Sequence, residues 1–277
     1  MDTSSVTALL PTHNRSVLLR RALASVCNQT SPPDEIIVVD DGSTDDTGEW
    51  LPREYPRVRY IRQEQRGVSA ARNRGIQAAA GDWIALLDSD DEWLPQKLER
   101  QLSALREAPE YRLCHTDELW IRNGRRVNPM RKHTKRGGWI FVHCLPLCAI
   151  SPSSALLHRS LFTELGTFDE SLPACEDYDM WLRVCSRYPV LFVDEALVVK
   201  YGGHGDQLSR QHWGMDRFRI QALENIISSG ALKDEDRRSA VGTLIGKIDV
   251  YVAGARKREK WDEVREYETM RSNWSNS

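Results

Sequence analysis

Two kinds of hydrophobic pattern alternate along the first half of the chain. Short runs of consecutive apolar residues, typical of strands buried on both faces, are separated by segments in which apolar residues recur every three or four positions. The runs predict strands at residues 6–10, 36–39, 58–61 and 83–87. The intervening segments predict a helix capped by Ser16, a short helix capped by Ser43 or Thr44, a helix that begins at Val68 and another near Pro95. This alternation indicates a largely parallel sheet with helices on both faces.

Polar residues directly follow the first, second and fourth predicted strands. Ligands of such sheets bind at the carboxyl ends of the parallel strands, so these residues are expected at one site. The fourth strand is followed by Asp88, Ser89 and Asp90, and two carboxylates two residues apart on an extended backbone point to the same face. These like charges repel each other unless a cation lies between them, and Mg²⁺ or Mn²⁺ suits such oxygen ligands. A solvated acidic turn is the structural alternative.

The second half of the chain has a less regular pattern. Asn123-Gly124 between two strand-like stretches predicts a β-hairpin. A helix is predicted from about Asp177, followed by two short strands at 190–193 and 198–201. From about residue 212 the pattern becomes helical, with breaks expected near residues 228–230 and between 257 and 261.

Composition narrows the class of protein. Of 277 residues, 40% are hydrophobic and 28% are charged, which is ordinary for a globular protein, and the net charge of −2 argues against a general nucleic-acid binder. No stretch approaches the roughly 18 apolar residues that span a bilayer. The six cysteines lack zinc-binding spacings and lie mostly among apolar residues, which predicts reduced core thiols. We therefore expect a cytoplasmic protein, for which the inner face of the membrane is a compatible location.

Five polar motifs follow one another along the chain. They are PTHNR at 11–15, VVDDGSTD at 38–45, GVSAARNRG at 67–75, LDSDD at 87–91 and CEDYDMWL at 175–182. In this order and spacing they resemble the family 2 glycosyltransferases of the GT-A fold, and the resemblance covers roughly residues 5–205. It implies an α/β fold of GT-A type, Rossmann-like, with a mixed, mostly parallel sheet flanked by helices and a C-terminal helical extension.

The resemblance also implies a domain organisation. Residues 1–210 would form the glycosyltransferase domain, with a nucleotide-binding half at 1–110 and an acceptor-binding half at 111–210. Residues 211–277 would form the helical extension. These C-terminal helices could pack on the domain, mediate a homodimer or make peripheral contact with a membrane surface.

The implied activity is that of a metal-dependent glycosyltransferase of hexosyltransferase type. It would move a sugar, with inversion, from a nucleotide-diphosphate donor to a hydroxyl acceptor, and a UDP-sugar is the favoured donor. The pathway expected is surface-polysaccharide or glycoconjugate synthesis, with a saccharide, a lipid-linked sugar or another hydroxyl compound as acceptor.

The first two motifs are expected to bind the nucleotide. Asp41 can accept a hydrogen bond from a ring N–H of uracil or guanine, while Asp40 would orient the loop or reach the ribose. Pro11, Thr12 and Asn14 are expected to line the same pocket. The structural alternative is a tight turn with a helix cap for the aspartates, and loop capping for Thr12 and Asn14.

The acidic motif after the fourth strand is expected to hold the cation. By similarity to the family, Asp90 is the firmer ligand of Mn²⁺ or Mg²⁺, and Asp88 binds the metal, its water shell or the ribose, with Ser89 beside them. His204, in a glycine-rich loop, could supply a further ligand, which would favour Mn²⁺. Asp91 is expected to cap the next helix.

Three residues on predicted helices complete the candidate site. Arg72 could contact the nucleotide or its phosphates, or it could pair with one of the aspartates. Asp177 is the candidate general base, because an acceptor hydroxyl is a poor nucleophile until its proton is removed. The helix dipole would lower the basicity of Asp177, whereas adjacent Glu176 and partial burial would raise it. The structural alternative is that the two acids only cap the helix.

The acceptor side carries weaker signals. Trp139, Trp181 and Trp213 could stack on a sugar ring, although tryptophan is more often a core residue. Residues 115–117 and 151–154 could line the acceptor cleft. The basic stretch at 131–136 could meet a phosphate-bearing acceptor or form a solvated loop.

Two other functions compete with sugar transfer. A non-catalytic nucleotide-sugar-binding or assembly subunit on the same fold is expected to lose the base or the acidic motif, and both are present here. A nucleotidyltransferase typically carries a glycine-rich basic loop after its first strand, whereas residues 11–15 contain no glycine.

Overall fold

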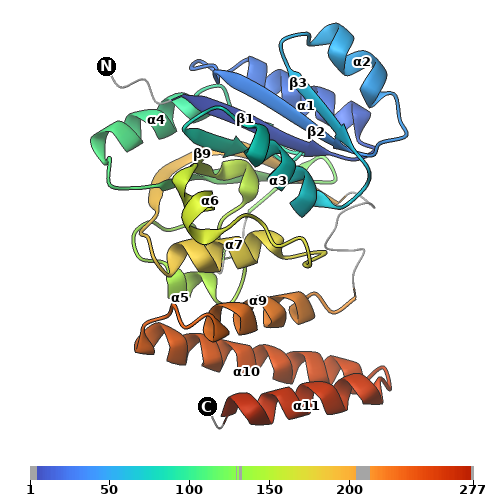
Figure 1. The fold of residues 1–277 in the computed structure, drawn as a ribbon, viewed down its shortest axis with the longest axis vertical. Coiled ribbons are helices and arrows are strands. Elements are labelled where there is room, and N and C mark those ends of the chain that lie inside the picture. The colour runs from blue at the N-terminus through green and yellow to red at the C-terminus, as the bar shows by residue number, and fades with distance from the viewer. Residues whose placement is uncertain (1–4, 129, 131–132, 204–212, 276–277) are drawn as a thin grey trace.

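A computed structural model describes residues 5–128, 130, 133–203 and 213–275 of the chain. Its described strands form one mixed sheet in the order β3-β2-β1-β4-β8-β6-β9-β5, with β7 paired to β6 (Figure 1). The strands are β1 (Val6–Thr12), β2 (Glu35–Asp41), β3 (Arg59–Gln63), β4 (Trp83–Leu86), β5 (Glu92–Trp93), β6 (Leu113–Arg122), β7 (Arg125–Val127), β8 (Leu156–His158) and β9 (Leu191–Gly202).

Helices cover the sheet and extend beyond it. They are α1 (Ser16–Cys27), α2 (Thr47–Glu54), α3 (Val68–Ala78), α4 (Lys97–Glu107), α5 (Phe141–Cys144), the 3-10 helix η2 (Pro152–Ser154), α6 (Ser160–Leu165), α7 (Glu176–Cys185), α9 (Asp216–Ser228), α10 (Asp234–Arg256) and α11 (Trp261–Ser275).

The first half of the sheet forms where the hydrophobic runs predict it. The neighbours β3-β2, β2-β1 and β1-β4 are all parallel, and all seven residues of β1 are buried. Successive side chains of β1 enter two different cores. Leu9 shares one core with residues of α3, whereas Ala8 and Leu10 share the other with residues of α1. Burial on both faces explains why the strand reads as a continuous apolar run.

The second half of the sheet corrects one prediction and confirms another. The two short strands expected at 190–193 and 198–201 are one strand, β9, which pairs with β6 in parallel. Its register shifts opposite Asp117, where extra residues of β9 interrupt the apolar pattern. The predicted hairpin is present: Arg122 pairs with Arg125 across Asn123 and Gly124, whose φ angles are 50° and 73°.

The starts of α1 and α2 differ from the predicted caps. Ser16 is the first residue of α1 rather than its cap, and its amide donates to Asp45 Oδ2 at 2.9 Å. Asp45 Oδ1 accepts from the amide of Thr47 at 3.1 Å, and α2 begins at Thr47 rather than at Ser43 or Thr44. A single carboxylate therefore satisfies an amide at the start of each helix.

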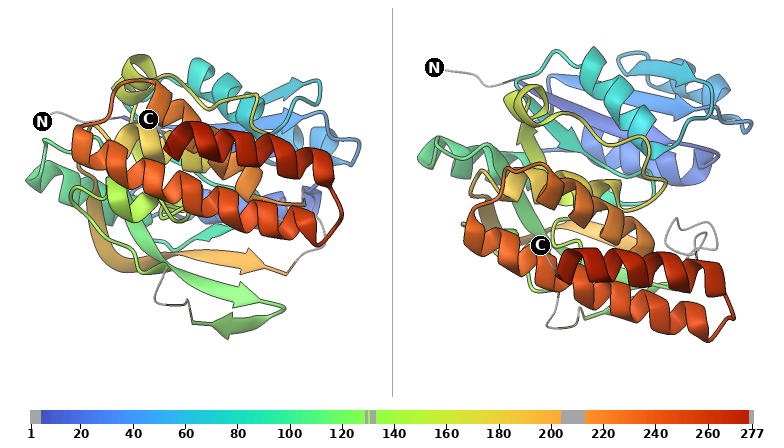
Figure 2. Two further views of the ribbon diagram at one scale, coloured as in Figure 1. Left: turned by 90° about the horizontal axis from the view of Figure 1, so that it is seen from below. Right: turned by 60° about the horizontal axis from the view of Figure 1, so that its bottom comes forward.

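The C-terminal helices pack on the rest of the chain. Figure 1 shows α9, α10 and α11 in layers below α7, and Figure 2 shows α10 and α11 side by side. Leu223 of α9 and Ile248 of α10 belong to the same buried cluster as Trp181 of α7. The two predicted breaks are confirmed, since α9 ends at Ser228 and α10 ends at Arg256.

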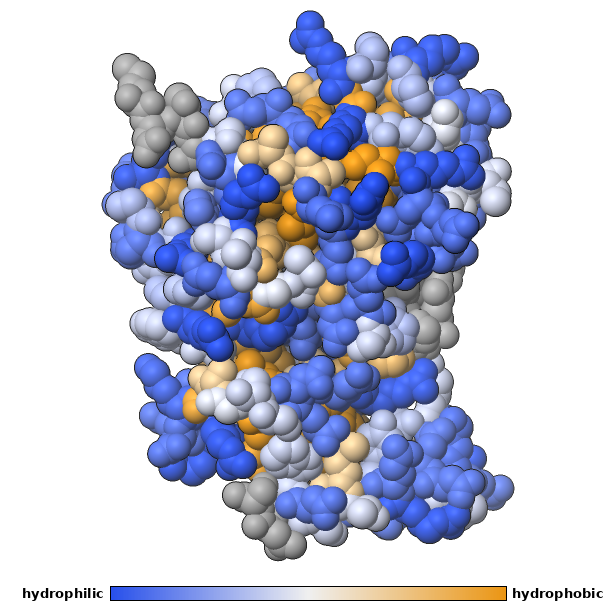
Figure 3. All heavy atoms as spheres, in the orientation of Figure 1, coloured by the Kyte–Doolittle hydropathy of each residue, from blue (hydrophilic) through white to orange (hydrophobic). Residues whose placement is uncertain are grey.

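The surface and the thiols agree with a globular chain. On the face drawn in Figure 3, hydrophilic residues cover most of the surface, with apolar residues in smaller areas between them. Among the helices of the described residues, none has both the length and the apolarity needed to cross a membrane. All six cysteines are free, and Cys114, Cys144, Cys175 and Cys185 are buried as predicted.

A lysine is buried at the start of α4. Lys97, the first residue of α4, is 0% exposed; its Nζ donates to Gln101 Oε1 at 2.8 Å and lies 4.1 Å from the ring centroid of Trp93. Burial lowers the pKa of Lys97 to about 7. The unfolded chain, in which a lysine titrates near pH 10.4, therefore binds more protons than the folded chain between pH 7 and pH 10.

This proton imbalance gives a signed prediction. The buried charge of Lys97 lowers the free energy of unfolding most below pH 7. This penalty disappears as the pH rises toward 10.5. At pH 7 we expect Lys97→Met to have a larger free energy of unfolding than the wild type. This difference should shrink by about 2–4 kcal/mol by pH 10, a range that allows for the contact between the lysine charge and the Trp93 ring. Urea unfolding of both proteins across this range measures it. The exposed Lys257→Met is the control, and an advantage of Lys97→Met that stays constant with pH would contradict the prediction.

Candidate active site

The loops after β1 and β2 are tied to each other. Asn14 has a φ of 51°; its amide donates to Ser43 Oγ at 2.8 Å, and its Oδ1 accepts from the amide of Thr44 at 2.7 Å. His13 Nδ1 lies 2.8 Å from the carbonyl oxygen of Asp41. Asn14 therefore makes the loop-capping contacts, and its contact with a nucleotide stays a prediction. The sequence pattern did not single out His13.

Thr12 and Pro11 end β1 at this edge of the sheet. Both are buried, and the hydroxyl of Thr12 has no hydrogen-bond partner among the described residues. A buried hydroxyl without a partner is uncommon in proteins, so this atom can still accept or donate a hydrogen bond to a ligand at the strand end.

The two aspartates that end β2 hold the backbone around them. Asp40 is 0% exposed and accepts from the amide of Ser43 at 2.8 Å and from the hydroxyl of Tyr60 at 2.5 Å. Asp40 therefore orients the loop, the first of its two predicted roles. Its complete burial does not fit the second role, contact with a ribose.

Asp41 is also engaged by the protein. Its Oδ1 accepts from Gln63 Nε2 at 2.7 Å and from the amide of Arg66 at 2.9 Å, and its Oδ2 accepts from the amide of Gly67 at 2.7 Å. Because each carboxylate oxygen offers two lone pairs, Oδ2 keeps one acceptor position. Recognition of a base N–H by Asp41 stays a prediction, and this position is the one available for it.

Arg72 joins the two acidic motifs that the sequence places far apart. Its Nη2 lies 2.8 Å from Asp88 Oδ1, and its Nη1 lies 2.5 Å from Glu176 Oε1. Arg72 is 3% exposed, so little of its side chain is available to a phosphate. Of its predicted roles, the structure shows the ion pair with an aspartate. Burial, opposed by Arg72, raises the pKa of Glu176 to about 6. The Arg72 guanidinium thereby brings the residue before Asp177 close to the acidic loop.

The acidic loop itself is only partly open. Asp90 pairs with Arg15 at 3.1 Å, and burial raises the pKa of Asp90 although Arg15 opposes this shift. Ser89 is 3% exposed and offers little surface to a donor. Asp88 is the more exposed of the two predicted metal ligands, with 26% of its side-chain area accessible against 15% for Asp90.

The predicted role of Asp91 as a helix cap is wrong. Asp91 is 1% exposed, its Oδ2 accepts from Ser153 Oγ at 2.6 Å, and its Oδ1 accepts from the amide of Tyr201 at 3.2 Å. The next α-helix, α4, begins six positions later at Lys97. Asp91 instead ties the acidic loop to β9 and to η2, and Ser153 Oγ also accepts from the amide of Asp88 at 3.2 Å.

Asp177 lies in the first turn of α7, as predicted. The preceding Cys175 has a left-handed backbone with a φ of 63°, which turns the chain sharply into the helix. Asp177 is partly exposed; its Oδ1 accepts from the amide of Tyr178 at 2.7 Å, and its Oδ2 accepts from Cys148 Sγ at 3.0 Å. Glu176 is buried in its ion pair, so Asp177 is the member of the acidic pair that a substrate can reach.

Lys200 of β9 is a residue that the sequence pattern did not identify. Its Nζ donates to Ser151 Oγ at 3.1 Å. Burial raises the pKa of Asp91 well above its ordinary value, although the charge of Lys200 opposes this rise. At Glu118 the charges of Lys135 and Lys200 outweigh burial, so the pKa of Glu118 is lowered. Lys200 lies in the short strand predicted at residues 198–201, and a lysine that follows two valines in a strand gave no functional signal. Residues 151–154, suggested only for the acceptor cleft, bring Lys200 and the acidic loop together.

Several predicted acceptor contacts are wrong because their side chains are buried. Trp181, His115 and Thr116 are all 0% exposed, so none of them can meet a sugar in this structure. Trp213 packs against Tyr251 with ring centroids 5.3 Å apart, and its role stays a prediction.

Other predicted acceptor contacts remain open. Trp139 is 66% exposed, with Lys233 Nζ 5.5 Å from its ring centroid. In the basic stretch, Lys135 is buried and pairs with Glu118 at 3.3 Å rather than standing in a solvated loop. His204 lies outside the described residues.

The carboxylates of the acidic loop are of the type that divalent cations bind together with a substrate, although each is paired with an arginine. In the described part of the chain, no three histidine, cysteine, aspartate or glutamate side chains converge as a metal cage. Mg²⁺ and related ions usually take one or two carboxylates and complete their shell with phosphate oxygens and water. Asp88 and Asp90 offer this type of oxygen donor.

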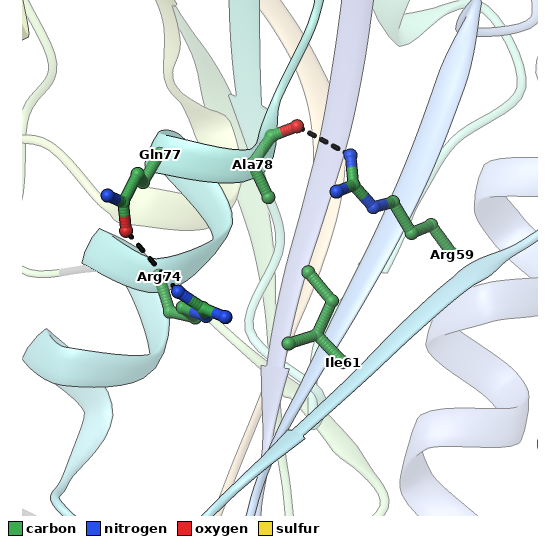
Figure 4. Close-up of a pocket in the computed structure, with 5 residues that line it drawn as sticks. All are labelled: Arg59, Ile61, Arg74, Gln77 and Ala78. Carbon is green, nitrogen blue, oxygen red and sulfur yellow. Dashed lines mark hydrogen bonds between the residues drawn. The ribbon is translucent and has the colours of Figure 1, made fainter.

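One cavity of the structure lies away from these residues. It has a volume of about 280 Å³ and is lined by Arg59, Ile61, Arg74, Gln77 and Ala78 (Figure 4). Arg59 begins β3, so this cavity lies at the amino end of the strand, whereas the polar motifs lie at the carboxyl ends. It is therefore not part of the candidate active site.

Two solved structures share the fold. Residues 1–349 of S. aureus TarS, in complex with UDP-GlcNAc, superimpose with a TM-score of 0.68 at 16% identity, over 97% of this chain and 92% of that one. The mannosyltransferase PcManGT from Pyrobaculum calidifontis, in complex with GDP-Man and Mn²⁺, gives 0.64 at 17% identity, over 98% and 84%. At these identities the likeness shows the fold alone, which is of the GT-A type.

Sequence similarity identifies the family. Residues 7–165 match the model of Glycosyl transferase family 2. An uncharacterized glycosyltransferase of Rickettsia felis is 32% identical over 197 residues, which are 70% of this chain and 32% of that protein. The chain spans about a third of the length of the first such relatives. Because the family model covers more than half of the chain, including the motifs that end β1, β2 and β4, the chain belongs to glycosyl transferase family 2, and its fold is of the GT-A type.

Proposed function

We propose that this chain transfers a sugar, with inversion, from a nucleotide-diphosphate donor to a hydroxyl acceptor, with Asp177 as the general base. A UDP-sugar is the favoured donor, and the pathway proposed is surface-polysaccharide or glycoconjugate synthesis in the cytoplasm. The proposal assigns residues 1–210 to the transferase and residues 211–277 to a helical extension. It is supported by the nucleotide sugars that the two structural neighbours bind, UDP-GlcNAc and GDP-Man.

One observation carries the proposal. Arg72 contacts Asp88 of the acidic loop and Glu176 beside Asp177, at 2.8 Å and 2.5 Å. A candidate donor-binding group and a candidate base are therefore linked through one buried side chain, although 88 residues separate Asp88 from Glu176 in the sequence. An in-line displacement needs a leaving-group site and a base at opposite ends of one cavity, and this arrangement can supply both.

In the proposed reaction, Asp177 accepts the proton of the acceptor hydroxyl. The acceptor oxygen forms a bond to the anomeric carbon on the face opposite the nucleotide, while the bond from that carbon to the phosphate oxygen breaks and its electron pair leaves with the diphosphate. A divalent cation held by Asp88 and Asp90 would neutralise the negative charge that grows on the diphosphate. Arg72 keeps the Asp88 carboxylate oriented toward this end of the site.

A thermal-shift panel tests the donor and the cation together. UDP-, GDP-, dTDP- and CDP-sugars are each added with and without Mn²⁺, since a ligand that binds the folded state raises the melting temperature. We expect one nucleotide class, UDP by preference, to raise Tm by several degrees more with Mn²⁺ than without it. Asp90→Asn is expected to remove the Mn²⁺-dependent part of this shift.

The control for this panel is Asp194→Asn, because Asp194 is exposed on β9. It should keep the full shift. A donor shift that is the same with and without Mn²⁺ in the wild type would refute the metal assignment. A donor that binds but is never cleaved, with any hydroxyl acceptor or water, would favour the non-catalytic sugar-nucleotide-binding subunit.

A further inference from the structure

The thiol of Cys148 lies against the candidate base. Cys148 is partly exposed, and its Sγ is 3.0 Å from Asp177 Oδ2 and 3.2 Å from the carbonyl oxygen of Ile150. A thiol carries one proton, and the carboxylate is both the nearer and the more strongly charged acceptor. The S–H group therefore donates to Asp177.

The chemistry of this contact makes the cysteine a donor and not a nucleophile. Burial, together with the neighbouring Asp177 carboxylate, raises the pKa of Cys148 well above its ordinary value. The thiolate is the reactive form of cysteine, so a thiol that stays protonated does not compete with the acceptor for the anomeric carbon.

The loop that carries Cys148 is held at several points. The carbonyl oxygen of Leu145 accepts from the hydroxyl of Tyr178 at 2.5 Å, and that of Pro146 accepts from Lys247 Nζ at 2.9 Å. The carbonyl oxygen of Ala149 accepts from Lys135 Nζ at 3.1 Å. Lys247 belongs to α10, so the C-terminal helices help to hold this loop in place.

We propose that Cys148 is a positioning residue for Asp177, an inference that rests on the proposed function of Asp177 as the base. The amide of Tyr178 fixes Oδ1, and the thiol of Cys148 fixes Oδ2. With both oxygens held, the plane of the carboxylate is set before the acceptor binds. Oδ2 keeps a second lone pair for the acceptor hydroxyl.

Substitution separates the hydrogen bond from mere packing. With UDP-GlcNAc and Mn²⁺ as the first probe, and UDP release as the readout, Cys148→Ala should lower kcat about 10- to 100-fold while the donor KM changes less than about twofold, because the base is misplaced and the donor site is not. Cys148→Ser, whose hydroxyl can donate in the same way, should recover most of the loss. The control is Cys27→Ser, since Cys27 is exposed at the end of α1.

A second readout does not depend on turnover. The infrared S–H stretching band of Cys148, isolated as the difference between wild type and Cys148→Ser, should move to higher wavenumber in Asp177→Ala, because the strong carboxylate acceptor is gone. In an Asp177→Asn background, Cys148→Ala should cause no further loss of kcat, since there is no base left to position.

The outcomes of these experiments distinguish the positioning role of Cys148 from the proposed role of Asp177 as the general base. The inference is overturned if Cys148→Ala turns over within twofold of wild type, if Cys148→Ser is as slow as Cys148→Ala, or if the S–H band does not move in Asp177→Ala. Full activity of Asp177→Asn would instead remove the base role itself. The S–H band reports the contact in either case, including when Cys148→Ala is too unstable for kinetics, because the band requires only the wild type, Cys148→Ser and Asp177→Ala.

Discussion

Asp177→Asn should lower kcat for nucleotide release about 10²- to 10⁴-fold, while the Kd for the donor stays within about twofold. The amide has nearly the shape of the carboxylate but cannot take up the acceptor proton. Donor affinity should persist because Asp177 contacts Tyr178 and Cys148, and neither belongs to the acidic loop after β4. Steady-state kinetics with the donor chosen by the thermal-shift panel, together with calorimetric donor binding, measure the two quantities.

The exposed Asp194 supplies the matched control for this substitution. Asp194→Asn removes the same charge from β9 and should keep wild-type turnover. If Asp177→Asn lost donor affinity and turnover by the same factor, the residue would act in donor binding rather than as a base.

Arg72→Met should lower the free energy of unfolding by about 3–5 kcal/mol, because it leaves the Glu176 carboxylate buried without its partner. Glu176 retains only 6% of its side-chain exposure, so water cannot replace the guanidinium. The loss should be larger at pH 8 than at pH 5. The pKa of Glu176 is already raised to about 6 with Arg72 present, and an unpaired Glu176 can avoid its charge by binding a proton at the lower pH.

A double variant and a surface variant test the cause of this loss. Arg72→Met with Glu176→Gln should be more stable than Arg72→Met alone at pH 8, since the uncompensated charge is removed. Arg66→Met breaks an exposed pair with Glu170 and should change stability by less than about 0.5 kcal/mol. Unfolding in guanidinium chloride measures the wild type and the three variants. Equal small losses in free energy of unfolding for Arg72→Met and Arg66→Met would show that the buried pair stabilises the fold no more than the exposed one.

Hydrophobic patterning predicted most of the fold because it reports local geometry. The runs that became β1, β2, β3 and β4 are continuous, since helices cover both faces of that half of the sheet. The hairpin at Asn123-Gly124 was equally visible, since a tight turn is specified by its own residues. The pattern failed at β9, where the shift in register opposite Asp117 broke one long strand into two apparent ones.

The sequence by itself determined the family, the strand-end positions of Asp41, Asp88 and Asp90, and the place of Asp177 at the start of a helix. Only the tertiary structure decided which partners these groups take. Arg72 pairs with a carboxylate 104 residues away, Asp91 binds Ser153 and β9 instead of capping a helix, and Cys148 reaches Asp177 across 29 residues. Periodicity and motifs record how each segment folds locally, whereas these contacts depend on how the sheet and its loops bring distant segments together.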